Sequence, residues 1–157
     1  MIKIGIGYDV HKFAPERKLI LGGVEMPFVI GLDGHSDADV LVHAIMDALL
    51  GAAALGDIGT HFPPTDAQYK DINSTLLLEK VVALLMQHGF TVGNIDTVIV
   101  ADRPKLSAYI PEMRANVARI CKVPEQSISI KATTEEGLGL AGQGIGTHCV
   151  CTIIKSK

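Results

Sequence analysis

The sequence contains no tryptophan, and aromatic residues make up only 4% of its 157 residues. Proteins that hold single-stranded nucleic acid stack its bases on aromatic side chains, so this class of function is not expected. The formal net charge is −3, which offers no positive field to a nucleic acid or to an anionic membrane surface. We therefore expect neither a nucleic acid nor a membrane as partner.

Long apolar runs and a cysteine framework are also missing. No apolar stretch reaches the roughly 18 residues that a membrane-spanning helix needs. The start of the chain lacks the basic segment, apolar core and cleavage site of a secretory signal. The three cysteines indicate no disulfide framework, as is typical of a reducing compartment. We expect a cytoplasmic, bacterial-type protein, or one of a plastid-type organelle if a transit peptide lies outside this chain.

The hydrophobic pattern predicts one globular domain over residues 1–157. Ser36 or Asp37 is expected to cap the first helix, which would end at Gly56, and Asn73 or Ser74 to cap the second. Residues 56–72 are expected to form a mobile loop. The predicted elements are strands 2–9, 95–102, 127–134 and 147–154, a hairpin 19–26 around Gly22-Gly23, and helices 38–55, 75–88 and 108–122.

This order of elements predicts an α+β fold. Strands and helices do not alternate as in a doubly wound parallel sheet, so helices packed on one face of a sheet suit the order better. We expect a mixed, mainly antiparallel four-stranded sheet, with a β-α-β-α-β-β core and a small additional hairpin. Cys121, Cys149 and Cys151 are expected to be small buried side chains of the core.

A carboxylate and two imidazoles form a candidate metal site. Asp9 and His11 are two residues apart on the first strand, so they point to one face, whereas Val10 between them is expected to turn into the core. His43 lies among apolar residues in the first helix and could supply a third ligand. This set suits Zn²⁺ with one open position, or another divalent metal. The alternative is a strand end with two solvated polar residues.

Two further features flank this candidate site. Asp39, His43 and Asp47 are spaced four residues apart on one helix face, so Asp47 could accept the free N–H of His43. The same stripe could be merely a solvated face. His35 and Ser36 precede the helix, whose N-terminus attracts phosphate, although His35 could also be an ordinary loop histidine.

Four segments together resemble the 2-C-methyl-D-erythritol 2,4-cyclodiphosphate synthase family. They are "GYDVHKF", "GHSDADVLVHAIMDALLGAAALGDIGTHFPPTD", "NIDTVIVADRPKL" and "IKATTEEGLG". The resemblance runs in order over nearly the whole chain. It implies a phosphorus–oxygen lyase of the non-mevalonate isoprenoid pathway that cyclises 4-diphosphocytidyl-2-C-methyl-D-erythritol 2-phosphate and releases CMP.

The resemblance also implies roles for individual residues. Asp9, His11 and His43 would hold Zn²⁺ or another divalent ion, and Glu136 would help place Mg²⁺ or Mn²⁺ on the diphosphate. His35 and Thr134 would stabilise the transition state. The implied substrate-binding positions are Asp9, Val10, His11, His35, Ser36, Asp57, Ile58, Gly59, Phe62, Pro63, Pro64, Thr65, Asp66, Ala101, Asp102, Arg103, Pro104, Lys105, Leu106, Ser107, Thr133, Thr134, Glu135, Glu136, Leu140 and Gln143.

Within that set, each stretch corresponds to one part of the substrate. Residues 57–59 match the segment that contacts methylerythritol, 62–66 a loop that closes over the site, and 101–107 with 133–135 the cytidine pocket. The sequence departs from the family at three positions. Pro64 stands where the family often has an acidic residue, Leu140 where it often has Phe, and Gln143 where it often has Arg. Losing Arg removes a bidentate phosphate donor, which puts in doubt an anion or isoprenoid diphosphate site on a trimer axis.

The family resemblance implies a homotrimer with its sites between subunits, and the small residues of "ALLGAAAL" would permit close packing. Two other functions remain open. A metal-dependent phosphoesterase would use the same Asp-His-His site with water as the nucleophile. A non-catalytic, oligomeric metal-binding module would use the metal for assembly alone.

Overall fold

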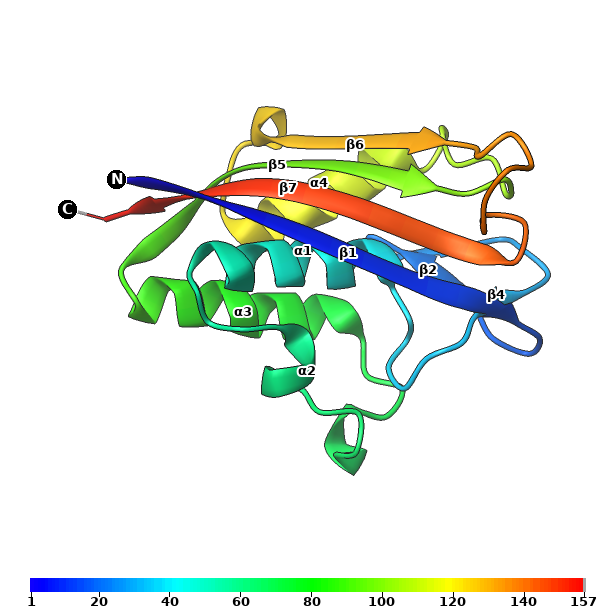
Figure 1. The fold of residues 1–157 in the computed structure, drawn as a ribbon, viewed down its shortest axis with the longest axis horizontal. Coiled ribbons are helices and arrows are strands. Elements are labelled where there is room, and N and C mark those ends of the chain that lie inside the picture. Colours follow the sequence, from blue (N-terminus) through cyan, green and yellow to red (C-terminus); the bar gives the residue numbers. More distant parts are fainter. Residues whose placement is uncertain (157) are drawn as a thin grey trace.

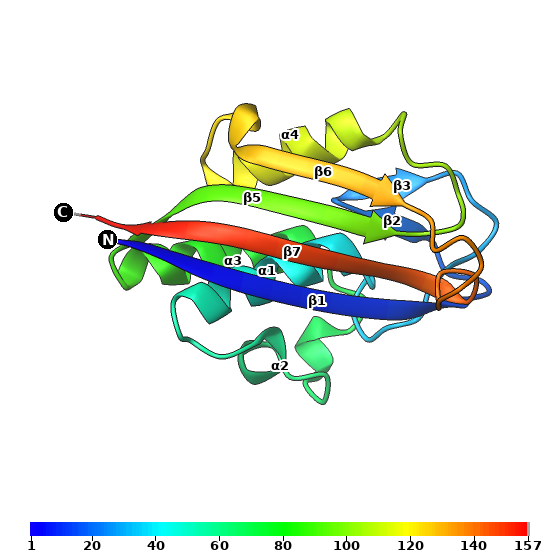
Figure 2. The ribbon, with the colours of Figure 1, turned by 45° about the horizontal axis from the view of Figure 1, so that its top comes forward.

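A computed structural model describes residues 1–156, which form a twisted sheet covered on one face by helices (Figure 1). The strand order is β4-β1-β7-β5-β6, with β5 and β6 parallel and the other neighbours antiparallel. Figure 2 shows the long β1, β7 and β5 side by side. The strands are Ile2–Ala14 (β1), Gly31–Leu32 (β4), Phe90–Val100 (β5), Ile128–Thr133 (β6) and Gly144–Lys155 (β7). The predicted mixed sheet is confirmed, and the two-residue β4 extends its four main strands.

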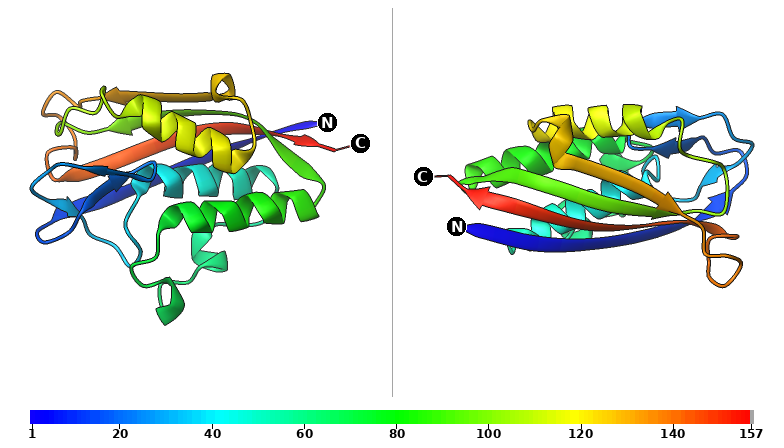
Figure 3. Two further views of the ribbon diagram at one scale, coloured as in Figure 1. Left: turned by 180° about the vertical axis from the view of Figure 1, so that it is seen from behind. Right: turned by 90° about the horizontal axis from the view of Figure 1, so that it is seen from above.

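Three longer helices lie on one face of this sheet (Figure 3). They are Val40–Ala52 (α1), Ser74–Gln87 (α3) and Ile110–Cys121 (α4). Alternate side chains of β5, β6 and β7 pack against them, and Cys121, Cys149 and Cys151 are buried in this core as predicted. None of the helices described over residues 1–156 has the length and apolarity to cross a membrane.

The helix boundaries depend on caps that the sequence indicates only in part. Asn73 caps α3 as predicted, accepting the N–H of Thr75. The cap of α1 is Asp39, so the prediction of Ser36 or Asp37 is wrong. Asp39 takes the N-cap position because its carboxylate accepts the N–H of Val42, and it also accepts those of Gly22 and Gly23 in the neighbouring hairpin. That hairpin joins Leu19–Leu21 (β2) to Val24–Met26 (β3), where both glycines have positive φ.

α1 also ends earlier than predicted. Its last residue is Ala52, and Ala54 has a φ of 60°, so the chain has left the helix before Gly56. The predicted loop 56–72 contains one short helix, Ile58–His61 (α2), and a 3₁₀ turn, Ala67–Tyr69. A second 3₁₀ turn, Glu125–Ser127, precedes β6. The segment between α1 and α3 is therefore locally structured.

β1 and α1 approach each other at backbone distance. A Cβ added to Gly5 would lie 1.9 Å from the carbonyl oxygen of Ala48, and one added to Gly7 would lie 2.0 Å from that of Ala44. Only glycine permits this approach. The small residues of α1 therefore serve packing inside the subunit, and Ala48 is fully buried there.

The opposite face of β1 carries a row of exposed apolar side chains. Ile4 is 72% exposed, Ile6 74% and Val10 42%, so the expectation that Val10 turns into the core is wrong. Because neighbouring strand residues point to opposite faces, placing Gly7, Asp9 and His11 toward the helices forces Val10 outward. Across the strand pair, Val150 and Ile154 of β7 extend this apolar face opposite Ile6 and Ile2.

Candidate metal centre and substrate cavities

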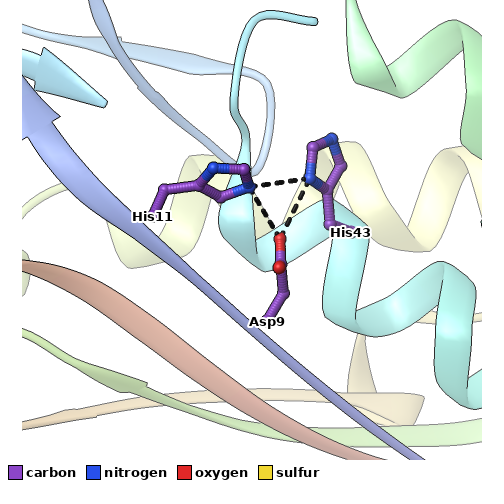
Figure 4. Close-up of side chains that lie close together, drawn as sticks. All are labelled: Asp9, His11 and His43. Carbon is purple, nitrogen blue, oxygen red and sulfur yellow. Dashed lines mark hydrogen bonds and ion pairs between the residues drawn. The ribbon is translucent and has the colours of Figure 1, made fainter. Parts of the chain in front are cut away.

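Asp9, His11 and His43 converge on one point between β1 and α1 (Figure 4). Asp9 Oδ2 lies 2.8 Å from His11 Nε2 and 3.0 Å from His43 Nδ1. The two ring nitrogens are 3.2 Å apart. The predicted grouping of these three side chains is thus present, and it joins residues more than thirty positions apart.

The charges in this group are strongly coupled. Burial by itself would raise the pKa of Asp9, but hydrogen bonds with His11 and His43 outweigh it and lower that pKa. Burial would lower the pKa of His11, but the hydrogen bond with Asp9 and its charge raise it above the ordinary 6.5. The carboxylate thus favours a positive charge beside it, which a cation can supply.

The orientation of His11 is fixed by a backbone carbonyl. His11 Nδ1 lies 2.7 Å from the carbonyl oxygen of Asp33. A carbonyl can only accept, so Nδ1–H donates to it, and Nε2 is the nitrogen that faces Asp9 and can bind a metal once it is deprotonated. One carboxylate oxygen and two imidazole nitrogens facing one point are a donor set that suits Zn²⁺ and related divalent ions.

A cavity of about 240 Å³ opens beside this metal centre. Of the predicted positions, Asp9, His11, His35, Ser36, His43, Ile58, Gly59, Phe62 and Pro64 line it. Met46, Tyr69 and Leu77 also line it and were not predicted. Met46 and Leu77 have the helical spacing of core residues, so the sequence carries no signal of their role. Tyr69 packs against Phe62 with ring centroids 5.4 Å apart, and an aromatic residue in a polar loop was the available clue.

His35 belongs to this cavity and is held by the loop across it. Its Nε2 lies 3.0 Å from the carbonyl oxygen of Asp66, so the ring donates from Nε2. Asp57, Pro63, Thr65 and Asp66 belong to the same segment without lining the cavity. Asp57 caps α2 through the N–H of Thr60.

Asp47 does not orient His43, so that hypothesis is wrong. Asp47 Oδ1 accepts the N–H of Ile58 at 2.8 Å and so fixes the start of α2. Burial raises the pKa of Asp47, and this N–H bond offsets part of the rise. The second ring nitrogen of His43 instead faces two serine hydroxyls, Ser74 Oγ at 2.9 Å and Ser36 Oγ at 3.1 Å.

A second cavity, of about 450 Å³, gathers the predicted cytidine-binding positions. Lys105 and Thr134 lie in its lining, and none of the described residues lines both this cavity and the metal-centre cavity. Arg103 is outside it, over the rings of Phe13 and Phe28. The predicted residues in the lining are Ala101, Asp102, Pro104, Lys105, Leu106, Ser107, Thr133 and Thr134.

The remaining predicted positions lie on the loop before β7, except Val10, which lies in β1. Glu136 accepts a hydrogen bond from Thr134 Oγ1 at 2.8 Å, which places the two side chains together. Val10, Glu135 and Leu140 line a small cavity of about 50 Å³ on the outer side of the sheet. Gln143 is held through its backbone, accepting the N–H of Phe13. Within one chain, Glu136 therefore lies outside the group formed by Asp9, His11 and His43.

Known proteins match this sequence over nearly its whole length. The YgbB family model matches residues 2–155. A 2-C-methyl-D-erythritol 2,4-cyclodiphosphate synthase of Clostridium botulinum is 56% identical over 98% of this chain and 99% of its own. The enzyme of the same name from Clostridium kluyveri is 58% identical over 97% of this chain and 94% of its own.

Solved structures show the same fold. The bifunctional IspDF of Campylobacter jejuni superposes with a TM-score of 0.94 at 40% identity, over 99% of this chain. This chain spans only 42% of that longer protein. IspF of Plasmodium falciparum, solved as a CDP complex, has a TM-score of 0.87 at 33% identity, covering 99% of this chain and 97% of its own.

Proposed function

The chain belongs to the YgbB family, and from that premise we propose that it is a 2-C-methyl-D-erythritol 2,4-cyclodiphosphate synthase. It converts 4-diphosphocytidyl-2-C-methyl-D-erythritol 2-phosphate to the cyclic diphosphate and CMP, as a phosphorus–oxygen lyase. Residues 1–157 constitute one such domain. The observation that carries the proposal is the convergence of Asp9, His11 and His43 at the mouth of a cavity, within a chain that matches the family from end to end.

The reaction needs alignment and charge neutralisation more than covalent help. An oxygen of the substrate's 2-phosphate forms a bond to the β-phosphorus, while the bond between that phosphorus and the CMP oxygen breaks. A divalent ion held by Asp9, His11 and His43, Zn²⁺ in the first instance, would act as a Lewis acid toward the phosphate oxygens. Glu136 is suited to hold Mg²⁺ or Mn²⁺ on the diphosphate.

The protein's own groups bind and orient the reacting phosphates. His35 donates from Nε2 and can transfer that donation from the Asp66 carbonyl to a phosphate oxygen. The hydroxyl of Thr134 offers a second donor on the other side of the site. Lys105 supplies positive charge in the cytidine cavity. Donors placed where charge develops lower the barrier without moving during the reaction.

The cavity lining favours cyclisation over hydrolysis. Apolar side chains of Met46, Phe62 and Leu77 surround the polar groups and reduce the room for an attacking water. Residues 57–59, and the 62–66 loop hinged on the contact between His35 and Asp66, would close over the methylerythritol portion. A phosphoesterase would need a wetter site.

We further propose a homotrimer with sites shared between subunits. The metal centre and the cytidine cavity are separate within one chain, so a complete site requires a neighbour. The apolar row Ile4, Ile6 and Val10 offers a face to bury. Monomeric proteins seldom expose a continuous apolar patch of this kind without a partner.

The test is incubation of the metal-loaded protein with the CDP-linked substrate, followed by phosphorus NMR. Equal amounts of CMP and cyclic diphosphate support the synthase. Linear phosphate products would show a phosphoesterase instead. If the wild type shows no turnover and His43→Ala changes the oligomeric state, the result would support the non-catalytic metal-binding module instead.

A further inference from the structure

The side of His43 that faces away from the metal centre is enclosed by polar groups. His43 Nε2 lies 2.9 Å from Ser74 Oγ and 3.1 Å from Ser36 Oγ. Ser74 is the first residue of α3 and is fully buried, and His43 and Ser36 are also buried. Whether Nε2 carries a proton therefore depends on these hydroxyls.

The proton of the Ser74 hydroxyl is already committed. Asp37 Oδ2 accepts the backbone N–H of Ser74 at 2.9 Å, and its Oδ1 accepts that of Asp39 at 3.1 Å. Both oxygens of Asp37 thus act as acceptors. Ser74 Oγ lies 2.5 Å from Asp37 Oδ1, a distance typical of a hydroxyl donating to a carboxylate. Ser74 has one hydroxyl proton, and Asp37 receives it.

With that proton engaged, Ser74 Oγ presents only lone pairs to His43. An unprotonated Nε2 would place two lone pairs face to face at 2.9 Å, so Nε2 must carry the ring proton. Ser36 Oγ accepts the N–H of Ala38 and can accept a share of the same ring proton. His43 Nδ1 faces Asp9 and His11, so it is the ring nitrogen that can exchange its proton for a metal ion while Nε2–H stays with Ser74.

We propose that Asp37, acting through the Ser74 hydroxyl, is a positioning residue that fixes the tautomer of His43 and so makes Nδ1 the metal ligand. The inference rests on the proposed metal centre, and the tautomer is that of the metal-bound ring, since without a metal the Asp9 carboxylate 3.0 Å from Nδ1 accepts a proton from that nitrogen as well. The first turn of α3 thereby becomes part of the site, because Ser74 at its start links Asp37, in the loop before α1, to His43.

The experiment is nitrogen-15 NMR of histidine side chains in the Zn²⁺-loaded protein near neutral pH, paired with Zn²⁺ titration of the metal-free protein. We expect the wild-type His43 signals of an Nε2–H tautomer. Ser74→Ala should shift the Nε2 signal, because the acceptor of its proton is lost, and weaken Zn²⁺ binding by about 10- to 100-fold, the usual cost of losing a ligand's hydrogen-bond partner. Thr75→Ala is the matched control, since its hydroxyl bonds to Asn73 instead, and should change neither.

The outcomes separate this inference from the proposed function. A Zn²⁺-loaded wild type whose His43 is protonated on Nδ1 overturns the inference, as does a Ser74→Ala variant with an unchanged Nε2 signal and unchanged Zn²⁺ affinity. If Ser74→Ala does not fold, Ser74→Cys keeps the side-chain volume with a weaker hydrogen-bonding group and should show the same shifts. A Zn²⁺-loaded wild type that shows the Nε2–H tautomer but releases no CMP would support the role of Asp37 and Ser74 and contradict only the proposed function.

Discussion

At the scale of single residues, His43 is held at both ring nitrogens. Its Nδ1 faces Asp9 and His11, and its Nε2 faces Ser74 and Ser36. The ring is buried and has little freedom to turn. Truncating it therefore removes a ligand and leaves Asp9 without one of the two partners that lower its pKa.

His43→Ala should abolish stoichiometric Zn²⁺ binding and reduce CMP release by at least about a thousandfold, because a metal ligand and an oriented electrophile are lost together. Elemental analysis of the purified variant and a CMP assay measure both. His88→Ala, which removes an exposed histidine at the end of α3, serves as the control and should retain both properties. Full metal content in His43→Ala would refute the assignment.

Zn²⁺ affinity should fall as the pH is lowered, beginning above pH 6.5, because the pKa of His11 is raised from that value. The sign follows from competition, since only the unprotonated Nε2 can bind a metal, and acid converts it to the protonated form. Chelator competition between about pH 8 and about pH 5.5 measures the effect, across the range in which histidine titrates. A constant affinity throughout would contradict the placement of His11 in the site.

Residue-scale prediction from the sequence succeeded where local spacing decides the geometry. Asp9 and His11 share a face because strand periodicity requires it, and the fold brings His43 to them. The partner of His43 was missed, because helical spacing places Asp47 on the same side but cannot show what a different helix contributes. Ser74 is 31 positions from His43, and only the tertiary packing of α3 against α1 brings the two together.

At the scale of elements, the pairing of β1 with α1 sets the distance between the ligands. Gly5 and Gly7 let the strand touch the helix backbone, and Asp9 and His11 continue the same strand face. The sequence predicted both elements but not their separation. A glycine inside a strand indicates a close approach without naming the neighbour. The small residues of "ALLGAAAL" suggest close packing between subunits, whereas Ala48 and Ala52 of this stretch lie against Gly5 within one chain.

Gly7→Ala should destabilise the fold by about 1–3 kcal/mol or more, as overpacking of a tight core does. The added methyl meets backbone atoms of Ala44 and Ala48, which cannot rotate away. Thermal unfolding measures the loss, and Zn²⁺ affinity should fall with it because α1 carries His43. Gly89→Ala is not a suitable control, since Gly89 has a φ of 76°.

The matched comparison is Gly51→Ala, where the nearest atom is the Ile6 carbonyl oxygen at 3.9 Å and the backbone is helical. Alanine favours a helix over glycine by about 1 kcal/mol, so this variant should be at least as stable as the wild type. Equal stability of Gly7→Ala and the wild type would show that the strand and helix can separate without cost.

At the scale of the whole molecule, the proposed trimer should depend on the apolar face of β1. Ile6→Asp places a charge at a position 74% exposed in one subunit, so the subunit should fold while the trimer dissociates. Light scattering after gel filtration measures the mass. Leu76→Asp makes the same change at a residue of α3 that is 48% exposed and lies off this face, and it should remain trimeric. A trimeric Ile6→Asp would exclude this face as the interface.

Shared sites predict complementation between inactive variants. His43→Ala disables the metal side and Thr134→Ala the cytidine side, so a mixed trimer contains some sites built from two intact halves. Refolding the two variants together should recover a fraction of wild-type CMP release, while each alone stays inactive. Separate refolding followed by mixing on ice is the control. No recovery in mixed trimers would place the whole site within one chain.

The alternation of β1 has a consequence for how errors in this protein would appear. Odd positions of the strand carry the metal ligands, and even positions carry the exposed apolar row. A slip of one residue against β7 exchanges the two faces completely. A misregistered chain would lose the proposed metal site and the exposed apolar row in the same event. Metal binding at the proposed site would therefore require β1 to hold its native register against β7, the register that also turns Ile4, Ile6 and Val10 outward.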